Sequence, residues 1–265
     1  MTARSGPLLT DAEIQEIANT TIGQRNNPLW LNERRHRLTG SQFNKARVAL
    51  KKGGKALAKF IHKWVNNEEA TRSHLKAIKW GVDNEDKVIA KYKKQSQYDV
   101  RETGLWLFPN RILGASPDAI VYPNKESNTP IGILEVKCPY SAVFKKPVKY
   151  LYWNEDTQKT DLHKEHAYYD QIQGQLFATK VEWCDLAVWS PHMFEIVRVF
   201  PDIEWRDKVL PELEKFYKDM LEPALPRGVC HYVNFWKFHL MTSCVGVGKI
   251  QYITWQNFAI CFKLF

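Results

Sequence analysis

Ionisable residues set within two apolar, strand-like segments constrain the fold of this chain more than any other feature. The segments lie in GASPDAIVYPNKESNTPIGILEVKCPYSA, residues 114–142, and the polar loop PNKESNTP, residues 123–130, separates them. Their β-branched and apolar residues, bounded by Pro, Asn and Gly, predict two buried strands joined as a hairpin. Charged side chains are rare at buried positions unless they are paired or bind a ligand. Asp118, Glu135 and Lys137 are therefore the first candidates for a functional site.

Strand geometry brings these three side chains together. Because side chains alternate between the two faces of a strand, Glu135 and Lys137 point to the same side. If residues 117–122 and 131–137 pair as a hairpin, Asp118 lies beside Glu135. Two neighbouring carboxylates in a poorly solvated cleft raise each other's pKa, and a bridging cation relieves their repulsion. An ordinary salt bridge on a sheet face is the alternative interpretation of so short a pattern.

The chemistry of the carboxylate ligands selects the cation. Two carboxylates with coordination positions left for water and phosphate oxygens suit Mg²⁺, with Mn²⁺ as a substitute. They suit an all-protein Ca²⁺ cage, or a zinc site of nitrogen and sulfur ligands, less well. Lys137, one strand step from Glu135, is placed to hold an attacking water and to stabilise the charge that develops on a phosphate. The pattern favours metal-dependent phosphate chemistry.

The remaining sequence patterns predict a chain of mixed α and β structure. The segment T-D-A-E, from Thr10 to Glu13, has the spacing of a capping box and predicts a short N-terminal helix. Further helical patterns occur at residues 41–52, 55–65, 72–94, 164–179 and 202–222. Strand patterns occur at residues 99–108, 111–122, 131–137, 182–190 and 193–200. The first three strands follow one another closely, which predicts a meander.

Composition and the lack of targeting signals favour a soluble globular protein. The 265 residues, 44% hydrophobic and 13% aromatic, suit a packed core in one large or two small domains. The five cysteines form no C-x-x-C pair, which argues against a disulfide framework or a structural zinc site. The N-terminus lacks the apolar segment of a secretory signal, and no uncharged apolar run reaches the ~18 residues of a membrane span. We expect an intracellular protein without membrane contact, nuclear if eukaryotic and cytoplasmic if prokaryotic or viral.

Positive charge is concentrated in one region of the chain. Between Arg34 and Lys94 there are 17 Lys and Arg against 5 Asp and Glu, a surplus of 12 in a chain whose net charge is +9. Such a field favours phosphate polyanions, because each Lys or Arg that neutralises a phosphate releases condensed counterions. Solvated helix faces are the alternative interpretation, and charge alone does not decide between the two.

Other catalytic signatures are weak or missing. His163 and His166 are three residues apart, but no Cys or acid stands at a convincing spacing for a shared zinc ion, and a role at a helix start is favoured. No G-x-S-x-G or Cys/His nucleophile signature occurs, and Cys138 is better explained as a small packed residue. The lack of a G-x-x-x-x-G-K-[ST] loop argues against an ATP-driven motor within this chain.

Several separated motifs resemble those of one nuclease superfamily. S-P-D-A followed by L-E-V-K-C-P-Y-S resembles the signature of the PD-(D/E)xK nucleases. The continuation C-P-Y-S is similar to the branch that contains bacteriophage lambda exonuclease and the YqaJ-type viral recombinases. Three further segments match this branch in order, W-L-N-E-R-R-H-R-L-T-G-S at 30–41, W-G-V-D-N-E at 80–85 and Y-Y-D-Q-I-Q at 168–173. The resemblance covers residues 28–222.

The resemblance implies metal-binding and catalytic roles for matching residues of the hairpin and of the helix before it. Asp118 and Glu135 would bind the metal, with the Val136 carbonyl oxygen as a further ligand. Lys137 would be the catalytic lysine. Glu85, from the preceding helix, would lie near the metal and orient the site.

Further matching residues would contact DNA or line the active site. Arg34 and Ser41 would bind the phosphate at the 5′ end, although Ser41 is also a candidate helix N-cap. Ser116 would be a turn residue that contacts a phosphate. Tyr168 and Gln171, three residues apart on one helix face, would line the site, with Tyr168 towards the DNA and Gln171 among the catalytic residues.

The resemblance also implies a fold and a division into segments. The expected fold class is α/β (α+β), a restriction-endonuclease-like core in which helices flank a central mixed sheet. Residues 1–27 would form an N-terminal extension with a short helix, and 28–226 the nuclease domain. The apolar tail, 227–265, is unassigned. The loop at 123–130 is longer than the family pattern.

The implied activity is Mg²⁺-dependent hydrolysis of DNA. A 5′ to 3′ exonuclease on double-stranded ends would leave 3′ single strands for recombination or repair. The implied partners are double-stranded DNA ends, a single-strand annealing protein and further copies of the chain in a ring-shaped trimer. Two alternatives stay open, a structure-selective or single-strand nuclease of the same fold and a non-catalytic DNA-binding module.

Overall fold

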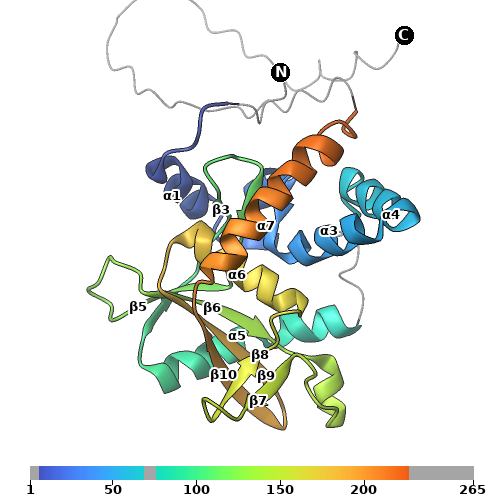
Figure 1. The fold of residues 1–265 in the computed structure, drawn as a ribbon. Helices are drawn as coiled ribbons and strands as arrows, with labels where there is room; N and C mark the ends of the chain where they lie inside the picture. The colour runs from blue at the N-terminus through green and yellow to red at the C-terminus, as the bar shows by residue number, and fades with distance from the viewer. Residues whose placement is uncertain (1–5, 69–75, 227–265) are drawn as a thin grey trace, which may run out of the picture. The chain divides into compact units, whose positions relative to one another are not determined.

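A computed structural model describes residues 6–68 and 76–226 of the chain. Helices dominate its first part and strands follow α5 (Figure 1). The capping box predicted at Thr10 and Glu13 is present at the start of α1. The elements of this part are α1 (Asp11–Thr20), the 3₁₀ turn η1 (Gln24–Asn26), α2 (Pro28–Arg34), β1 (Leu38–Thr39), α3 (Gly40–Lys52), α4 (Gly54–Val65) and α5 (Lys76–Ser96).

A five-stranded mixed sheet forms the centre of the second part. Its strand order is β10-β9-β6-β5-β2, with β6 and β9 parallel and the other neighbours antiparallel. These strands are β2 (Asp99–Arg101), β5 (Ala119–Tyr122), β6 (Gly132–Lys137), β9 (Trp183–Ser190) and β10 (Met193–Val199).

Two smaller sheets and four helical segments complete the described fold. The strands β1, β4 and β3 form one small sheet in that order, and β7 and β8 form a separate hairpin. The elements not yet given are β3 (Trp106–Leu107), β4 (Leu113–Ala115), η3 (Tyr140–Phe144), β7 (Leu151–Asn154), β8 (Lys159–Leu162), α6 (Ala167–Thr179), α7 (Ile203–Phe216) and the π-helical turn η4 (Tyr217–Leu221).

Helices cover both faces of the mixed sheet (Figure 1). On one face, Ile133 of β6 belongs to the same hydrophobic cluster as Ile172 and Leu176 of α6. On the other face, Leu134 of β6 shares a cluster with Val88 of α5. Because the side chains of β6 alternate, this one strand contacts both helices, and its end is positioned by both.

The predicted fold class is confirmed, because helices flank a central mixed sheet. The predicted hairpin is also confirmed, since β5 and β6 pair antiparallel with Ala119 opposite Leu134. The last two predicted strands pair as β9 and β10. The sequence patterns did not reveal α2 or the hairpin of β7 and β8.

The predicted meander is wrong. Strand β2 pairs with β5, whereas β3 and β4 leave for the small sheet. The cause lies at Gly104, where the backbone passes so close to α1 that an added Cβ would be 2.5 Å from the Ala18 carbonyl oxygen. The next residue, Leu105, donates its N–H to Thr21 Oγ1 at 2.8 Å. These contacts hold the chain against α1 and away from the mixed sheet.

The described N-terminal segment is part of the core, through Ile14 and Ala18 of α1. The domain boundaries placed at residues 28 and 226 stay predictions, and the unassigned tail lies outside the described residues. No helix within residues 6–68 and 76–226 is long and apolar enough to cross a membrane.

Candidate active site

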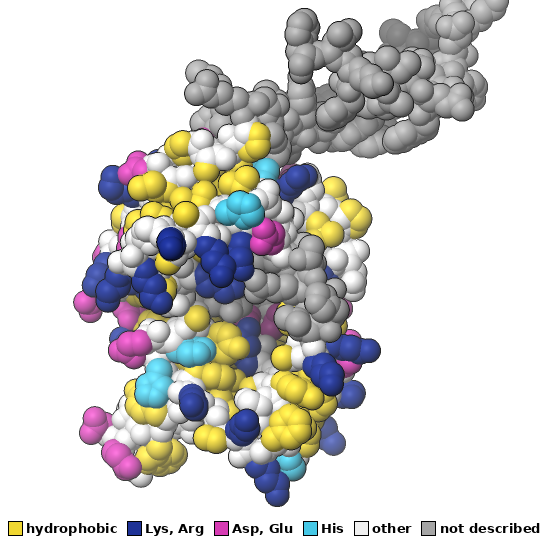
Figure 2. Space-filling view, turned by 90° about the vertical axis from the view of Figure 1, so that its right-hand side faces the viewer, with side chains coloured by type: hydrophobic (Ala, Val, Ile, Leu, Met, Phe, Trp, Pro, Cys, Tyr) yellow, Lys and Arg dark blue, Asp and Glu magenta, His cyan; other side chains and the backbone are white. Residues whose placement is uncertain are grey.

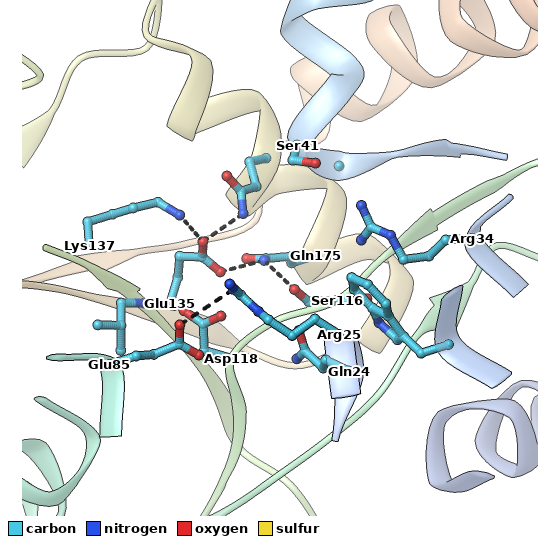
Figure 3. Close-up of a pocket in the computed structure, with 14 residues that line it drawn as sticks. Gln24, Arg25, Arg34, Ser41, Glu85, Ser116, Asp118, Glu135, Lys137 and Gln175 are labelled. Atoms are coloured by element: carbon cyan, nitrogen blue, oxygen red, sulfur yellow. Dashed lines mark hydrogen bonds and ion pairs between the residues drawn. The ribbon is translucent and has the colours of Figure 1, made fainter. Parts of the chain in front are cut away.

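A cavity of about 240 Å³ lies where β5 begins and β6 ends. Nine of the ten site residues predicted from the sequence line it, and Tyr168 is the exception. The lining consists of Gln24, Arg25, Trp30, Arg34, Gly40, Ser41, Glu85, Ser116, Asp118, Glu135, Val136, Lys137, Gln171 and Gln175 (Figure 3). The cavity therefore joins residues from α2, α3, α5, α6 and the hairpin.

Hairpin register places Asp118 opposite Glu135. Ala119 and Leu134 are partners in the antiparallel ladder; Asp118 precedes Ala119 on its strand, and Glu135 follows Leu134 on the other. Asp118 donates its backbone N–H to the Leu134 carbonyl at 3.1 Å. Its carboxylate Oδ2 accepts the Val136 N–H at 2.6 Å. The Asp118 side chain is thus fixed by the neighbouring strand rather than by a flexible loop.

The carboxylate of Glu135 is almost fully buried, with 2% of its side chain exposed, and each of its oxygens is bonded. Gln171 Nε2 donates to Oε1 and Gln175 Nε2 donates to Oε2, both at 2.6 Å. Lys137 Nζ forms an ion pair with Oε1. A buried carboxylate requires such donors, and here α6 supplies two of them.

Charge and burial shift the proton affinities of the cavity. Burial raises the pKa of Asp118 well above its ordinary value, and the Glu135 and Glu85 carboxylates raise it further. Burial also raises the pKa of Glu85, a shift that the Arg25 charge opposes. Burial lowers the pKa of Lys137, but the Glu135 and Asp118 charges outweigh it, and the pKa lies above its ordinary value. Lys137 is therefore a cation at neutral pH, surrounded by an excess of carboxylates.

The donor chemistry of the cavity fits a hard divalent cation. Glu85, Asp118 and Glu135 supply carboxylate oxygens, and Val136 lies in the same wall. The buried Oε1 atom of Gln175 accepts no hydrogen bond from the described residues, so a further oxygen beside the carboxylates has no partner there. The three carboxylates line the same cavity but do not form a complete set of metal ligands. Within residues 6–68 and 76–226, no group of three or more His, Cys, Asp or Glu side chains has the geometry of a metal site.

The other end of the cavity is formed by α2 and the start of α3 (Figure 3). The Arg34 guanidinium lies over the Trp30 ring, 4.1 Å from its centre, and Nη2 donates to Thr39 Oγ1 at 3.3 Å. Thr39 is the N-cap of α3, so the interpretation of Ser41 as the N-cap is wrong. Ser41 is instead the second residue of the helix, where backbone N–H groups attract anions.

Two predicted contact residues have additional partners. Ser116 Oγ accepts a hydrogen bond from Trp30 Nε1 at 2.9 Å, which fixes the turn before the hairpin. Tyr168 lines a neighbouring cavity of about 210 Å³ that shares Arg25, Glu85, Val136 and Lys137 with the first. Lys137 Nζ lies 4.7 Å from the centre of the Tyr168 ring, a cation–π contact.

Five residues that line the cavity were not predicted as site residues. Two of them, Trp30 and Gly40, belong to the sequence motif at 30–41, and the other three are Gln24, Arg25 and Gln175. Gln175 follows Gln171 by one helical turn, so helical spacing is the signal that identifies it. Gln173, inside the Y-Y-D-Q-I-Q motif, faces elsewhere and accepts the Asp202 N–H at 2.8 Å. Gln24 and Arg25 come from the segment before the predicted nuclease domain, where no sequence motif marks them.

The described part of the basic region found in the sequence includes the end of α2, the strand β1, the helices α3 and α4, and most of α5. Figure 2 views the molecule from the side on which α4 lies, and Lys and Arg side chains occur in both the upper and the lower part of that face. The cavity itself is lined by Arg25, Arg34 and Lys137. Positive side chains therefore lie at the cavity as well as on the surface.

A family model, the YqaJ-like viral recombinase domain, matches residues 29–182, more than half of the chain. The chain belongs to the YqaJ-like viral recombinase family. The match includes the hairpin and α6, and it begins after Arg25. Comparison with the sequences of curated proteins gives no significant match.

Solved structures share the fold of this YqaJ-like chain. The alkaline exonuclease LHK-Exo from Laribacter hongkongensis is 19% identical, with a TM-score of 0.55 over 74% of this chain and 93% of that chain. A SOX–DNA complex is 12% identical, with a TM-score of 0.53 over 82% and 74% of the two chains. The KSHV SOX–RNA complex is 12% identical, with a TM-score of 0.52 over 80% and 74%.

Proposed function

We propose that this chain is a divalent-cation-dependent deoxyribonuclease that digests double-stranded DNA from its 5′ ends and leaves 3′ single strands for recombination or repair. The observation that carries the proposal is the meeting of Asp118, Glu135 and Lys137 at one cavity in a YqaJ-like chain. Similar folds occur in a protein named an alkaline exonuclease and in complexes with DNA and RNA, which supports nucleic acid as the substrate class.

The proposed cation is Mg²⁺, with Mn²⁺ as a substitute. Asp118, Glu135, Glu85 and the Val136 carbonyl oxygen would hold it, since these are the hard oxygen ligands of the cavity. When bound, such a cation neutralises charge that develops on a phosphate and activates water. It also offsets the mutual repulsion of the carboxylates, which burial strengthens.

The protein's own groups supply orientation and charge. Lys137 remains protonated, and its ammonium, held between the Glu135 carboxylate and the Tyr168 ring, positions the attacking water and stabilises the negative phosphate. Gln171 and Gln175 hold the Glu135 carboxylate in one orientation. The substrate phosphate therefore meets a preorganised site rather than mobile side chains.

Recognition of the DNA end is assigned to the α2 and α3 side of the cavity. The Arg34 guanidinium, stacked on Trp30, and the first N–H groups of α3 around Ser41 are suited to a terminal 5′ phosphate. Ser116 lies between this end and the carboxylates and is a further phosphate contact in the proposal. A single-strand annealing partner and a ring-shaped trimer stay predictions.

The proposal is tested by the rate of digestion of duplexes with 5′-phosphoryl and 5′-hydroxyl ends. Charge-assisted hydrogen bonds to a phosphate contribute on the order of 1.5 to 3 kcal/mol, so the phosphorylated duplex should be digested roughly ten to a hundredfold faster. Arg34→Ala should remove most of this preference while the 5′-hydroxyl duplex is still cut. A wild-type ratio near one, or a high ratio that the substitution leaves unchanged, contradicts the proposed end recognition.

A further inference from the structure

Arg25 lies at the junction of the two cavities and lines both. Its side chain is 53% exposed, and Nη2 is 3.9 Å from Glu85 Oε2 (Figure 3). The figure shows the guanidinium between the Glu85 carboxylate and the Gln175 amide. The family model begins at residue 29, so this arginine is outside the matched region.

The turn that carries Arg25 has an uncommon backbone conformation. Gly23 and Gln24 have φ values of +87° and +43°, in the left-handed region, which a residue with a side chain adopts at a cost. Gln24 Nε2 offsets this by donating to the Thr103 carbonyl at 3.3 Å and to the Pro117 carbonyl at 2.8 Å. Pro117 directly precedes Asp118, so one amide side chain ties the turn to the catalytic hairpin. Strain of this kind concentrates where a side chain must be held in place for function.

The ion pair with Glu85 does not account for this arrangement. Exposed pairs at such a distance contribute little to stability, because solvent screens the charges. Because the pair is weak, Arg25 can give up its contact with Glu85 for another anion at little cost in free energy. A DNA strand entering the cavity brings phosphates towards Glu85 and Asp118, and a guanidinium beside them reduces the repulsion.

We propose that Arg25 binds a backbone phosphate of the DNA, exchanging its contact with Glu85 for that phosphate when DNA enters. The proposal rests on the proposed nuclease function. Because Arg25 lines both cavities, its phosphate lies between the end held near Arg34 and the part of the strand next to Tyr168. The exchange also frees the Glu85 carboxylate for its role in the site.

The binding test compares Arg25→Ala and Arg25→Lys with Arg206→Ala. Arg206 is a matched control, since it is 44% exposed, pairs with Asp207 at 2.8 Å and lies outside both cavities. The readout is the Kd for a fluorescent 5′-phosphorylated duplex, measured by anisotropy in EDTA over a range of NaCl concentrations.

Arg25→Ala should weaken binding about tenfold and lower the slope of log Kd against log salt by about one phosphate contact. Arg25→Lys should keep the slope but recover only part of the affinity, because an ammonium cannot donate in a bidentate fork. Arg206→Ala should match the wild type. An Arg25→Ala protein with wild-type Kd and slope overturns the proposal.

A second comparison separates phosphate binding from simple neutralisation of Glu85. If Arg25 acts only by masking Glu85, Arg25→Ala should have no effect on DNA binding in a Glu85→Gln background. Under the proposal the loss persists there. If the wild type fails to digest DNA while Arg25→Ala still lowers the salt slope, the nuclease function fails and the Arg25 contact stands. If the wild type digests DNA and the slope is unchanged, the Arg25 contact alone fails.

Discussion

At the scale of single residues, the site depends on how the buried Glu135 carboxylate is held. Three donors contact it, and two are glutamine amides from successive turns of α6. Gln175 also donates to the Ser116 carbonyl at 3.2 Å, so it links the carboxylate to the turn before the hairpin. If one donor is removed, a buried carboxylate oxygen loses a hydrogen-bond partner that water does not replace. The free-energy cost of leaving it unsatisfied exceeds the net contribution of the hydrogen bond.

Gln175→Ala should therefore lower the rate of DNA digestion by about tenfold, which corresponds to about 1.4 kcal/mol in transition-state stabilisation. DNA affinity should change little, because Gln175 carries no charge. Gln173→Ala is the contrasting variant, since its amide bonds the Phe200 carbonyl and the Asp202 N–H outside the cavity. It should lower the melting temperature instead of the rate. Equal rates for Gln175→Ala and the wild type, both fully folded, contradict the assignment.

The sequence alone predicts part of this residue-scale picture. Alternation along a strand and hairpin register are local rules, so the approach of Asp118 and Glu135 follows from the pattern. Gln175 needs only the helical period, applied one turn beyond the family motif. Arg25 does not follow from any local rule, because a left-handed turn held by a carbonyl about 90 residues away decides where its side chain lies.

At the scale of secondary-structure elements, Asp202 fixes the start of α7. Its carboxylate accepts the Trp205 N–H at 3.0 Å and the Tyr169 hydroxyl at 2.6 Å, and it pairs with Lys164 Nζ at 3.0 Å. Burial acts to raise the pKa of Asp202, but these hydrogen bonds outweigh it and lower the pKa to about 2. The carboxylate thus joins the N-terminus of α7 to α6, the helix that carries Gln171 and Gln175.

A carboxylate whose pKa is lower in the folded than in the unfolded state stabilises the fold at pH values above the unfolded-state pKa. This stabilisation is lost as the pH falls through the folded-state pKa. Asp202→Asn should therefore lower stability by about 1 to 2 kcal/mol at pH 7. The difference from the wild type should narrow between about pH 4 and pH 2, where the wild-type carboxylate becomes protonated. Thermal unfolding at several pH values measures it, and a difference that stays constant down to pH 2 contradicts the role of the ionised cap.

The sequence patterns predicted the pairing of the strands after β2 wrongly. Consecutive strands usually pair, but Gly104 allows the backbone to pass against α1, and this tertiary contact overrides the local preference. Sequence patterns do not reveal this contact, because a glycine between two predicted strands indicates only a turn.

Gly104→Ala should consequently destabilise the protein by about 1 to 3 kcal/mol, since the added methyl overlaps Thr21 Oγ1 and approaches the Ala18 carbonyl. Gly81→Ala in α5 is the matched control, because a Cβ at Gly81 meets nothing within 4 Å. It should be neutral or stabilising by up to about 1 kcal/mol, as expected for Gly to Ala inside a helix. Equal melting temperatures for the two variants would falsify the packing argument.

At the scale of the whole molecule, the mixed sheet and its helices bring distant segments to one cavity. Residues from the η1 turn to α6 are separated by more than 140 positions in the chain, yet they line the same wall (Figure 3). Lys and Arg side chains lie on the surface of the face that carries α4 (Figure 2), whereas Glu85, Asp118 and Glu135 line the cavity. DNA binding and DNA hydrolysis should therefore be separable, with salt weakening the first and carboxylate substitution abolishing the second.

The central claim is that this cavity hydrolyses DNA from the 5′ end. The most direct measurement is a time course on a linear duplex with one dye at the 5′ end and another at the 3′ end of the same strand, in Mg²⁺. The account predicts early release of the 5′ dye on short products while the 3′ dye stays on long strands. Asp118→Ala should release neither dye, although it still binds the duplex. Early release of the 3′ dye, or normal release of either dye by Asp118→Ala, would contradict the account.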